Sequence, residues 1–193
     1  MFDILFASIN QRVHLSPKEQ DEIVPFFIQK KLKKRQYLLQ QDDVAKYVAF
    51  VSKGLLRLWA SDDKGNEHIV QFALEGWWIT DMYSFLTAEP SGYCIDAIED
   101  SELLLLTREA NDALLDKVPK MERYFRILTQ NSMVSMQRRL MGSFRETAEE
   151  KYVKLLAKYP DVVQRVPQHM IASYLGVKPE TLSRTRKAIA SRK

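Results

Sequence analysis

The stretch PQHMIASYLGVKPETLSRTRK, residues 167–187, decides the fold of the C-terminal part of the chain. Ile171 and Leu175 lie four residues apart on one apolar face, which predicts a first helix. Gly176 ends that helix, because glycine reaches the left-handed conformation at little cost. Pro179 suits the first turn of a second helix, where its missing N–H is not needed. The stretch therefore predicts two helices joined by a tight turn.

The second of these helices carries a polar face with the chemistry that DNA bases require. Glu180 and Arg184 lie four residues apart, so both side chains fall on one face. A carboxylate can accept from the amino group of cytosine, and an arginine can bind both major-groove acceptors of guanine. Flanking cations add affinity for phosphates. The residues that we expect to contact DNA are Gln168, Lys178, Glu180, Thr181, Ser183, Arg184, Arg186 and Lys187. The alternative is an ordinary pair of amphipathic helices with a solvated charged face.

The charge of the chain is concentrated in the same part of the sequence. The whole chain has a formal net charge of +4. Residues 1–143 hold 18 Lys and Arg against 20 Asp and Glu, a net charge of −2. Residues 144–193 hold 11 Lys and Arg against 5 Asp and Glu, a net charge of +6. This asymmetry favours a nucleic-acid partner for the C-terminal part alone.

Composition excludes several other classes of protein. With 193 residues, 46% of them hydrophobic and 28% charged, the chain is expected to be globular. No apolar run approaches the roughly 20 residues that span a bilayer, so we expect no membrane partner. The N-terminal stretch lacks the features of a signal peptide, which predicts a cytoplasmic protein.

The reactive side chains form no recognisable catalytic or metal-binding motif. Cys94 is the only cysteine, which excludes a disulfide within one chain. His14, His68 and His169 are too far apart in the sequence for metal-ligand spacing. We therefore predict no catalytic residue, no metal site and no cofactor, and expect that the protein is not an enzyme.

The middle of the chain, residues 36–106, is predicted to form short strands. Asp62 to Asn66 is a strong hairpin signal, and the regular spacing of the strands suggests a small sandwich or barrel-like roll. Residues 1–34 are predicted to be helical in two pieces, the second beginning at Ser16-Pro17, and the basic run at 30–35 is interpreted as a solvated bend. The segments predicted as strands are 37–40, 47–54, 55–61, 67–74, 94–100 and 101–106.

Helices are predicted to follow the strands. A short helix is expected at 107–118, and a longer one from Pro119 to about residue 141. The apolar surface of the longer helix is wide enough to pack against more than one neighbour. One candidate is the strand domain of the same chain, and the other is the same helix of a second subunit. We expect a hinge at Gly142-Ser143 and a minor strand or extended connection at 162–166. The predicted domains are 1–118, 119–143 and 144–193.

The order of these elements resembles that of the Crp/Fnr family of bacterial transcription regulators over essentially the full length of the chain. The residues that carry the resemblance are Lys53-Gly54-Leu55, Asp62 to Glu67, Ala97 to Glu102, Ile171 to Val177 and Glu180 to Arg184. The resemblance implies an α+β fold: an N-terminal antiparallel β-roll of the cyclic-nucleotide-binding-like jelly-roll type with flanking helices, a long dimerisation helix and a C-terminal winged helix-turn-helix. It also implies homodimers, formed through residues 119–141, that bind palindromic operators. RNA polymerase and an unidentified small-molecule effector are further partners that it allows.

The resemblance fails at two places. Members that bind cyclic AMP carry an arginine that clamps the phosphate, and Ser91 stands at that position here. A buried cyclic phosphate would then lack its bidentate partner, so we expect no dependence on cyclic AMP. Pro179 replaces a further base-reading arginine of some members. A pocket for another ligand would use Trp77, Trp78, Asp81, Ser91 and Tyr93, although aromatic residues at such positions are more often part of the core.

Two other functions compete with DNA binding. One is a ligand-binding module whose C-terminal helices contact a protein partner, and the basic excess of residues 144–193 argues against it. The other is a small β-barrel enzyme, which the scattered histidines disfavour.

Overall fold

The computed structural model describes residues 1–191, so Arg192 and Lys193 of the predicted DNA-binding domain lie outside the described residues. The chain divides into two compact units. The first, here called the roll unit, contains residues 1–60 and 71–131. The second, the C-terminal unit, contains residues 61–70 and the chain from residue 132 onward. The boundaries between them fall inside two strands and inside the longest helix.

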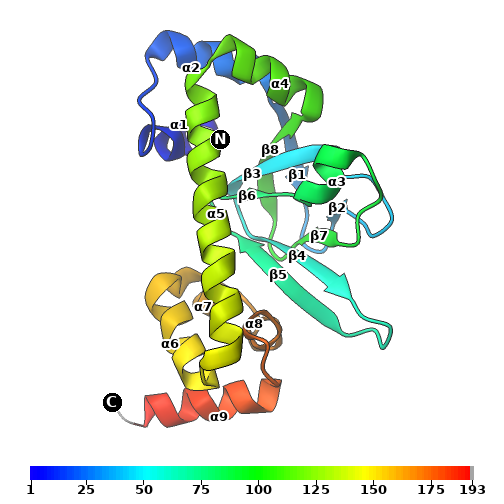
Figure 1. The fold of residues 1–193 in the computed structure, drawn as a ribbon, viewed down its shortest axis with the longest axis vertical. Coiled ribbons are helices and arrows are strands. Elements are labelled where there is room, and N and C mark those ends of the chain that lie inside the picture. Colours follow the sequence, from blue (N-terminus) through cyan, green and yellow to red (C-terminus); the bar gives the residue numbers. More distant parts are fainter. Residues whose placement is uncertain (192–193) are drawn as a thin grey trace. The chain divides into compact units, whose positions relative to one another are not determined.

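The roll unit is built on two antiparallel sheets of four strands each (Figure 1). All six segments predicted as strands contain one, and the predicted β-roll of an α+β fold is confirmed. The first sheet has the order β1 (Ile28–Leu32), β8 (Ser101–Thr107), β3 (Tyr47–Lys53) and β6 (Trp78–Ile79). The second has the order β2 (Tyr37–Leu39), β7 (Cys94–Ala97), β4 (Leu56–Ser61) and β5 (Glu67–Ala73).

The segment at 28–32 corrects the sequence prediction, which placed helix and a solvated bend there. It forms edge strand β1, paired with β8 so that Ile28 lies opposite Leu105. Only Leu32 of the strand is buried, so the alternation that identifies most strands is absent. The exposed lysines of β1 protect the open edge of the sheet from pairing with another chain.

The helices of the roll unit are α1 (Phe2–Asn10), α2 (Pro17–Ile23), the 3₁₀ turn η1 (Val24–Phe26), α3 (Met82–Thr87), α4 (Arg108–Lys117) and the first part of α5 (Lys120–Arg145). Side chains from α1, α4 and α5 pack with Phe50 and Leu104 of the first sheet into one hydrophobic core. Ser16 begins α2 with the predicted proline and a capping box, in which the Glu19 side chain accepts from the Ser16 N–H. A hydrogen bond from Lys120 and those from Ser16 lower the pKa of Glu19 from 4.5 to about 2.

The C-terminal unit continues α5 and adds α6 (Ala148–Lys158), α7 (Pro160–Arg165), α8 (Gln168–Leu175) and α9 (Pro179–Ala190) (Figure 1). Three predictions need correction here. The minor strand expected at 162–166 is helix α7, because Pro160 starts a helix whose spacing buries Val162 and Val163. The chain also does not break at Gly142-Ser143, since α5 runs on to Arg145. Residues 144–191 as described contain helices and turns, and show no strand of the predicted wing.

Helices α8 and α9 form the predicted helix pair. Gly176 adopts φ +66°, and the Val177 N–H donates to the carbonyl of Ala172 across the turn. Ile171 and Leu182 have no exposed surface, so the two helices share one apolar contact. None of the helices within residues 1–191 combines the length and apolarity that a membrane span requires.

Candidate nucleic-acid interface

The exposed face of α9 carries the side chains predicted to read bases. Glu180, Thr181, Arg184 and Lys187 are all exposed, and Leu182 fixes the opposite face of the helix in the core. Glu180 lies in the first turn, where the partial positive charge of the helix N-terminus favours a carboxylate. Helix α9 therefore presents the carboxylate of Glu180 and the guanidinium of Arg184 on one exposed face, while the buried Leu182 holds the opposite face in place.

A shallow hollow of about 520 Å³ lies between the first turns of α8 and α9. Gln168 of α8 and Glu180, Ser183 and Arg184 of α9 all line it, so four of the predicted DNA-contact residues are brought together. His169 lines the same hollow and was not among the predicted residues. The sequence marks His169 only by its position next to Gln168 at the start of the first helix. An imidazole at this position can donate a hydrogen bond to a phosphate or a base.

Arg186 has a different environment from the other cations of α9. It is half-buried, its Nη1 donates to Oε1 of Gln168 at 3.3 Å, and its guanidinium lies 5.9 Å from the ring centre of Tyr152 on α6. The side chain thus joins α9 to α8 and α6 and orients Gln168. Lys178, by contrast, is exposed at the N-cap of α9. Arg186 therefore has a positioning role beside any contact with phosphate.

The helices behind this face form a packed support. Tyr152 and Leu155 of α6 and Val162 of α7 are buried. Thr147 starts α6 with a capping box, and hydrogen bonds from the backbone and side chain of Thr147 lower the pKa of Glu150. Because each of these elements is fixed by burial or by a cap, the polar side chains of α9 are held in a defined arrangement.

The predicted effector pocket is only partly assembled. Asp81 caps α3, accepting from the N–H groups of Tyr83 (3.0 Å) and Ser84 (3.4 Å). Ser91 Oγ donates to the other carboxylate oxygen of Asp81 at 2.6 Å and accepts from the Tyr93 N–H at 3.0 Å. Asp81 and Ser91 are 5% and 1% exposed. Three of the five predicted residues therefore come together, but they bond to one another.

The two tryptophans belong elsewhere. Trp78 lies opposite Phe50 on the face of the first sheet that meets the helices, and its ring packs 5.2 Å from those of Phe50 and Phe125. Its Nε1 donates to the hydroxyl of Tyr124 at 3.0 Å. Trp77 is half-buried just before β6, with its backbone bonded to Leu74 and Val51. The structure thus places Trp78 in the aromatic core, away from the Asp81–Ser91 pair.

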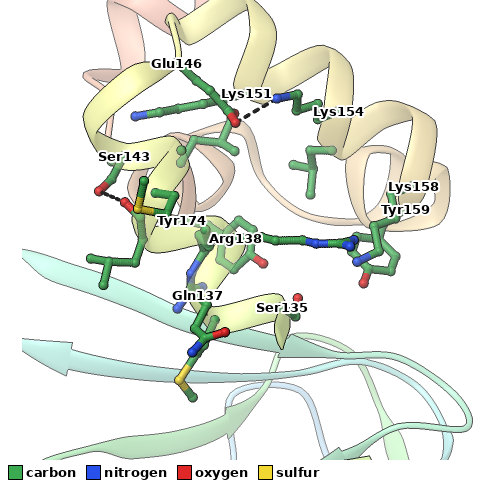
Figure 2. A pocket seen from close by; sticks show the side chains of 18 of the residues that line it. Ser135, Gln137, Arg138, Ser143, Glu146, Lys151, Lys154, Lys158, Tyr159 and Tyr174 are labelled. Carbon is green, nitrogen blue, oxygen red and sulfur yellow. Dashed lines mark hydrogen bonds and ion pairs between the residues drawn. The ribbon is translucent and has the colours of Figure 1, made fainter. Parts of the chain in front are cut away.

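The second half of α5 exposes a large apolar surface. Phe144 is 77% exposed, and the other exposed apolar residues are Met133, Val134, Met136, Leu140 and Met141. All of these except Phe144 line an open groove of about 1590 Å³, here called the α5 groove, together with Ile69 and residues of α6 and α8. Figure 2 shows its polar rim, where Lys154 pairs with Glu146 at 2.7 Å and Ser143 donates to the carbonyl of Leu140. Within residues 1–191, no group of three or more His, Cys, Asp or Glu side chains is placed to hold a metal ion.

Comparison with known proteins agrees with this architecture. Residues 29–118 match the family model described as "Cyclic nucleotide-binding domain". The chain is 26% identical over 187 residues to the cyclic AMP receptor protein of Thermus thermophilus. The alignment covers 91% of this chain and 83% of that protein. Among solved structures, FixK2 from Bradyrhizobium japonicum superposes with a TM-score of 0.74 at 19% identity, covering 86% of this chain and 85% of that one. The c-di-GMP responsive global regulator CLP of Xanthomonas campestris gives a TM-score of 0.72 at 14% identity, covering 92% and 93%. At these identities the structural matches show the fold.

Proposed function

We propose that this chain is a transcription regulator of the Crp/Fnr family that binds a palindromic DNA operator as a homodimer and catalyses no reaction. The observation that carries the proposal is the exposed Glu180–Arg184 face of α9 on a buried two-helix support. The net charge of +6 on residues 144–193 supports it, because phosphate contacts supply much of the affinity for DNA. Its proposed location is the cytoplasm.

The side chains of the interface divide into two roles. Arg184 binds the O6 and N7 acceptors of a guanine, and Glu180 accepts from the amino group of a cytosine. Thr181 and Ser183, which flank this pair, add hydroxyl contacts. Lys178, Lys187 and the Gln168–Arg186 pair bind phosphates and set the position of the helix on the duplex.

A second copy of the chain is the proposed partner of α5. The exposed apolar residues of its second half form a patch of the kind that marks a protein interaction site. Pairing of two α5 helices, within the range 119–141 expected from the sequence, would bury that surface in a two-fold symmetric contact. Two recognition helices would then meet half-sites about one helical turn, roughly 10 bp, apart. RNA polymerase is a further proposed partner of the DNA-bound dimer.

We further propose that cyclic AMP is not the effector. The Asp81 carboxylate already bonds the α3 amides and the hydroxyl of Ser91. A cyclic phosphate at this place would bring a second anion beside Asp81, where Ser91 carries no charge to neutralise it, and an uncompensated buried charge is costly. If another small molecule acts on the protein, it must use other contacts.

The proposal is tested by selecting bound fragments from random DNA with the purified, ligand-free protein at physiological salt. We expect recovery of a palindrome whose half-site contains the G·C pairs that Glu180 and Arg184 read. Addition of cyclic AMP is expected to leave the recovered sequence and its affinity unchanged. Recovery of no consensus, both with and without cell extract, would contradict DNA binding and favour a protein partner for the C-terminal helices.

A further inference from the structure

Helix α8 depends on a single residue for any positive charge that it brings to the candidate interface. The helix, Gln168–Leu175, contains no lysine and no arginine, so His169 is its only side chain that can become a cation. Helix α9, by comparison, carries Arg184, Arg186 and Lys187. Histidine gains or loses its charge between about pH 5 and 8, in the range where the cell works. The charge that α8 presents to a partner is therefore set by pH.

His169 lies in the hollow of about 520 Å³ between the first turns of α8 and α9. Its side chain is exposed, so a partner can reach it. The charged groups that line this hollow with it are Glu180 and Arg184, both from α9. The Glu180 carboxylate attracts a protonated imidazole and the Arg184 guanidinium repels it, so their effects on the charge of His169 oppose each other. A phosphate beside the ring would add a second attraction and favour the cation.

The neighbouring polar groups do not supply a free charge at the start of α8. In the proposed complex, Glu180 and Arg184 face base edges. Arg186 is half-buried, and its Nη1 donates to Oε1 of Gln168 at 3.3 Å, so its guanidinium is engaged in holding that amide. Gln168 itself is neutral and can offer a phosphate only a neutral hydrogen bond. At this end of α8, a phosphate therefore meets one amide and one imidazole.

We propose that His169 binds a DNA phosphate as an imidazolium, and that the affinity of the protein for DNA falls as the pH rises through the range in which histidine loses its proton. The inference rests on the proposed function, because it adds a residue to the same interface. A phosphate oxygen beside the ring stabilises the protonated form, so binding takes up a proton and is strongest at low pH. Protonation of His169 raises the net charge of residues 144–193 from +6 to +7. Because the contact is with a phosphate, it is the same on every DNA sequence.

The proposal is tested by fluorescence anisotropy of the full chain on a mixed-sequence duplex and on the selected operator, at about pH 5.5 and about pH 8. We expect the affinity of the wild type for both duplexes to fall by about fivefold for each protomer in contact, the upper end for one exposed ion pair. Measured at several salt concentrations, the slope of log K against log salt should flatten by about 0.9 for each protomer, the value for one lost phosphate contact.

Two substitutions at the same position separate charge from hydrogen bonding. His169→Gln keeps a donor without a charge, and we expect it to bind at both pH values as the wild type does at the higher one. His169→Lys keeps its charge at both, and we expect it to retain at the higher pH the affinity and salt slope that the wild type has at the lower one. His14→Gln and His68→Gln are the matched controls, since they remove the other two histidines of the chain, and both should keep the wild-type pH dependence.

The possible results have different consequences. A wild-type affinity that does not change with pH, or a His169→Gln variant that keeps the wild-type pH dependence, would overturn the inference and leave DNA binding in place. An effect of His169→Gln confined to the operator would assign the imidazole to a base and contradict the phosphate contact. Binding to neither duplex at either pH would overturn the proposed function and the inference with it. Slow amide exchange at the buried Leu182 in each variant shows that the helix pair is still folded.

Discussion

Carboxylates at two helix N-termini of this molecule have different environments. Glu180, in the first turn of α9, is exposed beside Arg184. Asp81, at the start of α3, is 5% exposed and accepts hydrogen bonds from two amides and from Ser91. Both carboxylates are favoured by the dipole of the helix that follows. Glu180 can exchange its bound water for a partner molecule, whereas Asp81 is already hydrogen-bonded to groups of its own chain.

The difference shows where a polar residue can act on a partner. At α9 the support is apolar and buried, so the polar face is free to bind. At α3 the polar residues are themselves the support, because they cap the helix and hold the loop that contains Ser91 and Tyr93. Removing a residue should therefore change recognition in the first region and stability in the second.

The largest effect is expected from the support of α9. Leu182→Ala removes a side chain with no exposed surface and should lower the free energy of unfolding by about 2–5 kcal/mol. Val153→Ala, on an α6 residue that is 45% exposed, is the control and should cost much less. Denaturant unfolding measures both. Equal losses for the two variants would show that the helix pair does not depend on this core.

Asp81→Ala should cost about 1–3 kcal/mol of stability, since it leaves the α3 amides and the Ser91 hydroxyl without their acceptor. Asp63→Ala, in the exposed hairpin turn, is the control and should be near neutral. Thermal unfolding compares them. A neutral Asp81→Ala that also gained affinity for cyclic AMP would mean that the site is a ligand pocket after all.

Lys187→Ala should weaken binding to all DNA sequences alike, because a phosphate contact carries no base information. The slope of log K against log salt should flatten by about 0.9, the value for one lost phosphate contact on duplex DNA. Fluorescence anisotropy on operator and random duplexes at several salt concentrations gives this slope. A loss confined to the operator would assign Lys187 to base reading instead.

The smallest effect is expected at the α2 cap, where Lys120 and Ser16 hold the pKa of Glu19 at about 2. A lowered pKa means that this contribution to stability is present above pH 4.5 and is lost as the pH falls toward 2. Lys120→Met should raise the pKa of Glu19 and so narrow the pH range over which this contribution to stability is lost. An NMR titration of the Glu19 carboxyl checks the direction, and an unchanged pKa would exclude Lys120 as its main cause.

The parts of the fold that could be predicted are those in which one residue has one local role. Gly176, Pro179 and the Ser16 cap each act within a turn or two, so their effect is visible in the sequence. Strand β1 was missed because its pairing with β8, and not its own pattern, makes it a strand. Helix α7 was missed because Val162 and Val163 fit either structure until tertiary packing decides.

The candidate sites also divide into features set by local sequence and features set by tertiary packing. Glu180 and Arg184 were predictable, because their spacing alone places them on one face. The bond between Asp81 and Ser91 and the separation of Trp78 from them depend on strand register, which the sequence pattern does not specify. The link between Ser173 and β5 spans more than 100 positions of the chain, and no local signal marks it.

The central claim, that α9 reads bases, is tested most directly by measuring Arg184→Ala and wild type against a set of operators mutated one base pair at a time. We predict that Arg184→Ala loses about 1–3 kcal/mol on the intact operator and becomes indifferent to one G·C position per half-site, while every other position keeps its wild-type penalty. An equal loss on every operator and on random DNA would contradict the claim and leave Arg184 as one more phosphate contact.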